Sequence, residues 1–166
     1  MVNQMVDYVI DENVIENAVH GKKPQKNGQS IELPADAENE FLYRFFRNKD
    51  RMFVNDKIRQ KIYSLEKRIR IKHKSEFLDN RIIPRLLETL QNFEKTITID
   101  GIQTEFSGVK NCDKEFVGVT LQSNATLVTA DGDLKILMVK DKLVSKCKCF
   151  TVEEVLDSHQ TNISQK

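Results

Sequence analysis

The sequence has no tryptophan, only three prolines and six glycines among 166 residues, and no apolar run as long as a membrane span. We therefore expect no membrane-spanning helix, and residues 1–10 also lack the apolar core of a signal peptide. Three cysteines are few, and an odd number cannot all pair, so we expect no disulfide framework. Neither a CxxC pair nor a nearby histidine completes a zinc site around Cys147 and Cys149. Buried or half-buried free thiols and a cytoplasmic location are the expectation.

The remaining composition is that of a folded protein. Hydrophobic residues make up 39% of the chain and charged residues 31%, which excludes an intrinsically disordered class. A chain of this length can bury a hydrophobic core as one domain. We expect that domain to span residues 1–158 and residues 159–166 to be a frayed tail.

Short apolar segments alternate with amphipathic ones along the chain. The patterns predict strands at residues 6–10, 51–54, 125–128 and 146–150. They predict helices after residue 12 and at residues 34–48, 55–74, 80–93, 116–121, 134–139 and 151–158. Residues 20–34 are expected to be a loop, and residues 96–101 either an edge strand or an extended connector. This order indicates an α/β fold with a parallel sheet.

Two carboxylates, Asp131 and Asp133, follow directly after the strand predicted at residues 125–128. In open α/β sheets ligands bind at the carboxyl ends of the strands. Close carboxylates repel each other unless a cation neutralises them, so the pair favours a hard divalent metal. An ordinary polar turn explains the same residues. Asp11, at the end of the first predicted strand, either points to the same edge or simply caps the next helix.

The helix predicted after Asn55 is strongly one-sided in charge. Between Lys57 and Lys74 eight lysines and arginines stand against one acid, Glu66, so this segment carries +7 while the whole chain carries +1. An apolar stripe runs along it, made by Ile58, Ile62, Leu65 and Ile69. Its basic outer face is either a solvated surface or a binding surface for a polyanion.

In the order and spacing of these segments the chain resembles the PIN domain family, metal-dependent ribonucleases of the PilT N-terminus type. The resemblance is carried by residues 8–15, 113–116 and 125–134, and by the closing segment at residues 151–156. It extends over essentially the whole chain.

The resemblance implies a three-layer α/β/α sandwich with a central parallel sheet. It implies a divalent-metal-dependent endoribonuclease that hydrolyses RNA phosphodiesters, either toxin-like with an antitoxin partner or an RNA-processing factor. Its catalytic residues, which also hold Mg²⁺ or Mn²⁺, would be Asp11, Asp113, Asp131 and Asp133. Asn13 and Thr129 would be the supporting polar residues. The RNA backbone would lie along the basic helix, at Lys61, Lys67, Arg68, Arg70 and Lys72.

One position departs from the family's pattern. The family usually carries a glutamate in the helix after the second strand, and that place falls at or next to Lys61. Glu38, Glu40 and Glu66 are the candidates to replace it. The departure favours, as the alternative, a catalytically weak or inactive PIN-fold protein that binds RNA or acts as a scaffold. A phosphoacceptor or phosphatase-like domain is a third hypothesis, and we also consider a homodimer.

Overall fold

The computed structural model describes residues 4–22, 25–30, 33–71, 79, 81–132, 134–135 and 148–163. Its central sheet consists of β1 (Asp7–Ile10), β4 (Arg51–Val54), β5 (Thr96–Thr98), β6 (Thr126–Thr129) and β7 (Lys148–Thr151). The strands lie in the order β5-β4-β1-β6-β7, and every neighbouring pair is parallel. The predicted α/β fold with a parallel sheet is therefore confirmed.

The chain changes direction at the middle of this sheet. From β1 it builds β4 and β5 on one side, and it then crosses back to add β6 and β7 on the other side. β1 and β6 are consequently neighbours whose connections lead opposite ways. In open α/β sheets a crevice forms outside the carboxyl ends of such a pair. Asp11 follows β1 and Asp131 follows β6, so both residues lie at that edge.

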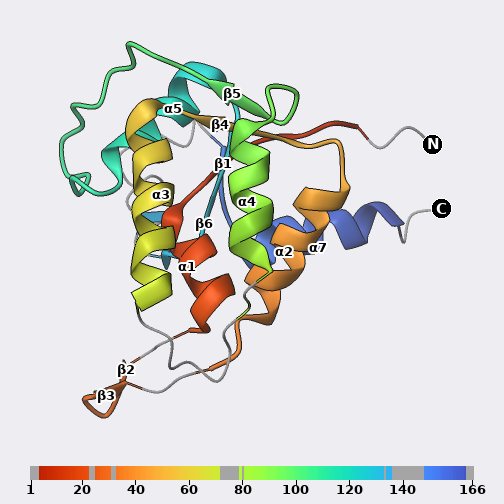
Figure 1. The fold of residues 1–166 in the computed structure, drawn as a ribbon, viewed down its shortest axis with the longest axis vertical. Coiled ribbons are helices and arrows are strands. Elements are labelled where there is room, and N and C mark those ends of the chain that lie inside the picture. The colour runs from red at the N-terminus through yellow and green to blue at the C-terminus, as the bar shows by residue number, and fades with distance from the viewer. Residues whose placement is uncertain are drawn as a thin grey trace.

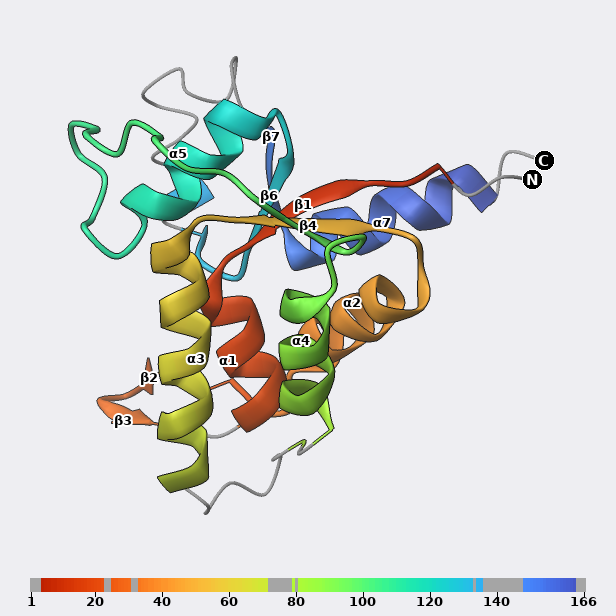
Figure 2. The same ribbon diagram turned by 45° about the horizontal axis from the view of Figure 1, so that its top comes forward.

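The described helices cover the two faces of the sheet unequally. They are α1 (Glu12–His20), α2 (Asp36–Arg47), α3 (Asp56–Ile71), α4 (Ile82–Gln91), α5 (Lys114–Ser123) and α7 (Val152–Ile163). Among them, α5 covers one face, where it contacts β1, β4 and β6, and the others pack together on the opposite face (Figures 1 and 2). This is a three-layer arrangement. None of the described helices combines the length and the apolar composition that crossing a bilayer requires.

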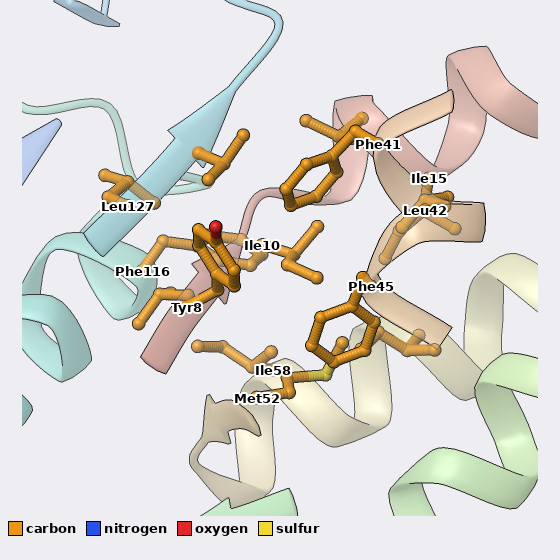
Figure 3. Close-up of a cluster of buried hydrophobic side chains, with 14 of the residues drawn as sticks. Tyr8, Ile10, Ile15, Phe41, Leu42, Phe45, Met52, Ile58, Phe116 and Leu127 are labelled. Atoms are coloured by element: carbon orange, nitrogen blue, oxygen red, sulfur yellow. The ribbon is translucent and has the colours of Figure 1, made fainter. Parts of the chain in front are cut away.

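The core lies on both faces of the sheet, between the sheet and the larger helical layer on one side and between the sheet and α5 on the other. Ile10 and Leu127, on neighbouring central strands, are almost completely buried, as expected for strands covered on both faces. The ring of Tyr8 meets the rings of Phe41 and Phe45 edge-on, at centroid distances of 5.3 and 6.3 Å (Figure 3). Burying each such side chain contributes about 1.5–3 kcal/mol. The packing therefore fixes β1 against α2.

Two helix starts follow local sequence chemistry. Asn55 caps α3, because its Oδ1 accepts a 2.8 Å hydrogen bond from the amide of Ile58. At α7 the Thr151 hydroxyl accepts from the Glu154 amide at 3.3 Å, and the Glu154 carboxylate accepts from the Thr151 amide at 3.2 Å. This reciprocal pair is a capping box, so both predicted helix starts are confirmed.

Two predicted segments were wrong in part. The loop expected at residues 20–34 contains a hairpin of β2 (Gln25–Lys26) and β3 (Gln29–Ser30). Asn27 and Gly28 form its turn with φ of 53° and 74°, the left-handed conformations that two-residue hairpin turns require. The last helix continues to Ile163 instead of ending near residue 158, because no glycine or proline interrupts it. The predicted frayed tail therefore begins inside α7.

Other expectations are settled only where the chain is described. Residues 96–98 form a true edge strand, because β5 pairs with β4. Leu134 and Lys135 are helical, but residues 136–139 of that predicted helix lie outside the described residues. Cys112 and Cys149 are free thiols as expected. The expected burial is confirmed for Cys149 and wrong for Cys112. Cys112 is exposed, because it lies in the surface turn before α5, and Cys147 lies outside the described residues.

Candidate functional site

Asp11 is a buried carboxylate at the carboxyl end of β1. It occupies the cap position of α1 but its side chain makes no capping hydrogen bond, so the simple helix-cap explanation is wrong. Only 2% of its surface is exposed, and its Oδ2 accepts a 2.9 Å hydrogen bond from the Thr129 hydroxyl. Burial raises the pKa of Asp11 to about 7, against the lowering effect of the Thr129 hydrogen bond, and the negative charge of Asp113 raises it further.

The register of the sheet brings Asp11 and Thr129 together. Ile10 is paired with Val128, and the Asp11 amide continues the ladder by donating to the Val128 carbonyl at 3.0 Å. The next residue of β6 is Thr129, whose side chain is fully buried. Parallel pairing of β1 and β6 therefore places the carboxylate beside the hydroxyl although 118 residues separate them.

Asn13 and Thr129 support the segment that follows β6. The Thr129 Oγ1 accepts a 2.9 Å hydrogen bond from the Asp131 amide and a longer one, 3.5 Å, from the Asn13 amide group. The Asn13 Oδ1 accepts from the Ala130 amide at 3.0 Å. The Asp131 carboxylate in turn accepts from the Leu134 amide at 3.3 Å, so part of its role is that of a turn cap. Together these bonds fix where Asp131 stands.

Asp113 approaches the same edge from α5. It is 8% exposed, and it occupies the cap position of α5 without a side-chain capping bond. Burial raises the pKa of Asp113, the hydrogen bond from the Cys112 thiol at 3.6 Å lowers it, and the negative charge of Asp131 raises it again. Asp113 therefore interacts electrostatically with both Asp11 and Asp131, and the three acids form a coupled row.

The charge of this row favours binding of a hard cation, but the spacing of its carboxylates does not form a complete metal site. Burial and like charge both oppose ionisation of Asp11 and Asp113, and a divalent cation beside them would offset both effects. Among the described residues, however, no three histidine, cysteine or acidic side chains are grouped closely enough to hold a metal ion together. Asp133 lies outside the described residues. The row is thus oxygen-rich and close to β1 and β6, but it is not a closed cage.

The start of α3 holds the first turn of α5. The Asn55 amide group donates a 2.6 Å hydrogen bond to the buried carboxylate of Glu115, and the Lys57 ammonium lies 3.2 Å from the same carboxylate. One turn later the Lys61 ammonium donates to the Cys112 carbonyl and lies 4.9 Å from the centre of the Phe116 ring. Because Asp113 stands between these contact points, α3 determines its position.

Lys61 is close to the acid row but is not bonded to it. Its positive charge lowers the pKa of Asp113, while its hydrogen bond goes to the Cys112 carbonyl. The ammonium therefore affects Asp113 by its charge alone, and its hydrogen bond holds the turn before α5.

The acids considered as replacements for the missing glutamate have other surroundings. Glu38 is 1% exposed and lies 3.2 Å from the ammonium of Lys22, and Glu40 pairs with Arg44 within α2. Glu66 is half-buried on α3.

The acid that the fold does bring to this edge is Glu115, which the sequence analysis did not single out. It lines a cavity of about 200 Å³ with Asp100 and Thr104. The available clue was a second acid two residues after Asp113 in one helical turn.

The basic face of α3 is used partly within the protein. The apolar stripe is confirmed at Ile58, Ile62 and Leu65, which are buried, and the side chain of Ile69 lies outside the described residues. Lys67 is exposed, and Arg68 is 53% exposed with its guanidinium 3.9 Å from the Glu12 carboxylate. The side chain of Arg70 and all of Lys72 lie outside the described residues. Lys67 and Arg68 are thus available to a partner.

Comparison of the chain with protein-family models, with curated proteins and with solved structures found no significant match. The class of this protein is therefore defined by its fold and its candidate site alone. It is a three-layer α/β protein with a row of three acids, of which Asp11 and Asp113 are buried, at the carboxyl edge of its parallel sheet, where the connections of the neighbouring strands β1 and β6 lead opposite ways.

Proposed function

We propose that this protein is a divalent-metal-dependent endoribonuclease of the PIN-domain type. The observation that carries the proposal is the row of electrostatically interacting acids Asp11, Asp113 and Asp131 at the carboxyl edge of the sheet. At this edge the connections of the neighbouring strands β1 and β6 lead opposite ways. Ligands bind at such edges in α/β proteins. Burial and the charge of Asp113 raise the pKa of Asp11, and burial and the charge of Asp131 raise the pKa of Asp113. Raised carboxyl pKa values of this kind are typical of functional sites.

The proposed chemistry assigns each residue a task. Asp11, Asp113 and Asp131 would hold Mg²⁺ or Mn²⁺, and Asp133, two residues after Asp131 in the sequence, would join them. The bound metal would supply a water of lowered pKa and offset charge on the phosphorane-like transition state. Thr129 would keep the Asp11 carboxylate oriented through its hydroxyl. Asn13, bonded to the Ala130 amide, would hold the loop that carries Asp131.

The proposed substrate is RNA in the cytoplasm. Exposed cations on α3, among them Lys67 and Arg68, would contact phosphates and leave the bases unread. Such a nuclease acts either as a toxin held by an antitoxin or as a processing factor with a protein partner. A neighbouring gene for a small DNA-binding antitoxin would favour the first.

The test is metal-dependent cleavage of single-stranded RNA by the full chain. Cleavage is expected with Mn²⁺, none with EDTA, and at least about 100-fold less for Asp113→Asn, because one ligand and its charge are lost. Asp36→Asn, an exposed acid in the first turn of α2, is the matched control and should cleave like wild type. Equal cleavage by Asp113→Asn and wild type contradicts the proposed site.

A second candidate function is favoured by Lys61. Its charge near Asp113 partly replaces that of a cation, and no closed three-acid group is present among the described residues. A PIN-fold RNA-binding or scaffold protein without catalysis fits these two observations. It predicts salt-dependent RNA binding with no cleavage in Mn²⁺ and no loss of binding in EDTA. Trapping of an acyl-phosphate would instead point to the phosphoacceptor hypothesis.

A further inference from the structure

Gly118 allows the connection between β5 and α5 to pack directly against the helix. This connection, residues 99–113, leaves the sheet and arcs back over α5 (Figures 1 and 2). A Cβ atom at position 118 would lie 2.5 Å from the Gln103 carbonyl oxygen, closer than such atoms approach in proteins, and 3.1 Å from the end of the Ile102 side chain. The missing side chain at Gly118 therefore sets how closely the connection lies on α5.

A cavity of about 200 Å³ lies between this connection and the starts of α3 and α5. The start of α3 forms one wall, Glu115 of α5 forms a second, and the connection forms the third. Asn55, in the first wall, follows β4, which is the neighbour of β1 in the sheet. The cavity therefore opens on the same carboxyl edge as Asp11, one to two strand spacings or about 5–10 Å away.

Most polar groups of the cavity are already engaged within the protein. The Asn55 amide group donates to the Glu115 carboxylate, and the Lys57 ammonium lies beside the same carboxylate. Asp56 lies in the first turn of α3, where the helix dipole stabilises an acid. In the part of the chain that the structure describes, the Asp100 carboxylate makes no hydrogen bond or ion pair. The cavity therefore offers a carboxylate acceptor, and a ligand must bring the donors.

The lining of the cavity selects among the groups of an RNA strand. Three carboxylates line it against one ammonium, so phosphate is repelled. Guanine presents two neighbouring donors, N1–H and N2–H₂, on its Watson–Crick edge, and one carboxylate can accept both. Adenine and cytosine place an acceptor nitrogen beside their amino group, and uracil has a carbonyl on each side of its N3–H. The side chain of Ile102 adds apolar surface for a flat ring.

We propose that this cavity binds a guanine base of the RNA, with the Asp100 carboxylate accepting from N1–H and N2–H₂. The inference rests on the proposed function and deepens it, because a phosphate next to the bound guanine reaches the acid row. Cleavage is then directed to positions beside guanine, while the cations of α3 contact phosphates. Gly118 becomes a specificity-determining residue, since a side chain there displaces the wall that the connection forms.

Binding of two short single-stranded RNAs to the full chain tests the proposal. The RNAs differ at one position, which carries guanosine or inosine, and inosine lacks only the N2 amino group. Fluorescence anisotropy in EDTA measures binding without cleavage. Wild type is expected to bind the guanosine RNA about 10-fold more tightly. Asp100→Ala should remove this preference, and the matched control Asp36→Ala, an exposed acid of α2 outside the cavity, should keep it.

Gly118→Ala tests the wall of the cavity. It should reduce the guanosine preference, and thermal unfolding shows whether the fold is kept. Asp100 is exposed, so Asp100→Ala tests the proposal without disturbing the contact at Gly118.

Equal binding of the two RNAs by wild type, or a guanosine preference that survives in Asp100→Ala, overturns the proposal. Binding of arginine amide without a guanosine preference also overturns it and assigns the cavity to a guanidinium group. Cleavage in Mn²⁺ is measured separately. A guanosine preference without cleavage supports the base site and contradicts the nuclease, whereas cleavage without the preference contradicts the base site alone.

Discussion

The hydroxyl of Thr129 donates a 2.9 Å hydrogen bond to the buried carboxylate of Asp11 and accepts one of the same length from the amide of Asp131. The Thr129 hydroxyl oxygen therefore links Asp11, which follows β1, to Asp131, which lies in the turn after β6. The positions of two acids in the row depend on it.

Thr129→Val should destabilise the protein by about 1–3 kcal/mol, because it leaves a buried carboxylate and a backbone amide without their shared partner. Thr129→Ser keeps the hydroxyl and should recover most of the loss. The matched control is Thr120→Val, since Thr120 is equally buried but its hydroxyl only donates to the Phe116 carbonyl of its own helix. Urea unfolding measures all three. Equal losses for Thr129→Val and Thr120→Val would mean that the link has no special role.

The raised pKa of Asp11 predicts a pH dependence of stability. In the folded state this carboxyl titrates at a pKa of about 7, against an ordinary value of 3.8. Between these values the folded state holds a proton that the unfolded state releases. The free energy of unfolding gained from that proton is complete below pH 3.8 and is lost as the pH rises through about 7. Asp11→Asn should therefore match wild type near pH 4 and exceed its stability at about pH 8, by up to about 4 kcal/mol.

Urea unfolding at the two pH values measures this difference. Mn²⁺ provides a second readout, because a cation at the acid row should stabilise wild type at about pH 8 and should do so much less in Asp11→Asn. EDTA should reverse the effect. A variant less stable than wild type at the higher pH would show that Asp11 is ionised and well paired in the fold.

Substitution of Lys61 separates its two effects. Lys61→Glu should lower stability in the absence of metal, because it breaks the bond to the Cys112 carbonyl and adds negative charge near Asp113. The same variant should bind Mn²⁺ more tightly and raise any EDTA-sensitive RNA cleavage, because the new carboxylate is a hard ligand. Lys61→Gln, which loses the charge but keeps an N–H donor, should fall between the two. Calorimetry with Mn²⁺ and thermal unfolding measure these changes.

If Lys61→Glu binds Mn²⁺ no better than Lys61→Gln, residue 61 does not reach the metal. Glu115→Gln is then the informative variant, since Glu115 is the buried acid that Asn55 and Lys57 hold at this edge.

The basic face of α3 should account for the salt dependence of RNA binding. Each phosphate contact contributes a slope of about −0.7 in a log–log plot for single strands. Four substitutions to glutamine should flatten the slope by up to about 3 units. The four positions are Lys67, Arg68, Arg70 and Lys72. A control protein with the same loss of charge carries glutamine at Arg44, Arg47, Arg81 and Lys148. A slope equal to wild type in the α3 variant would mean that this face is only solvated.

Local sequence chemistry determined the elements and most of their ends. The apolar run before Asp11 predicts a central strand because both faces of such a strand are covered, and Ile10 is indeed buried. Thr151 and Glu154 predict a helix start because their two hydrogen bonds are made within four residues. The hairpin at Asn27-Gly28 was equally local, and its two-residue turn was present in the sequence.

Only the tertiary structure decided which distant side chains meet. That Asp11 bonds to Thr129, and does not cap its helix, follows from the pairing of β1 with β6, which sequence periodicity does not specify. The direction of Lys61 and the burial of Glu115 depend on how α3 crosses the start of α5. Hydrogen bonds within a turn are encoded by neighbouring residues, whereas these contacts depend on strand order and helix packing, which the whole chain sets at once.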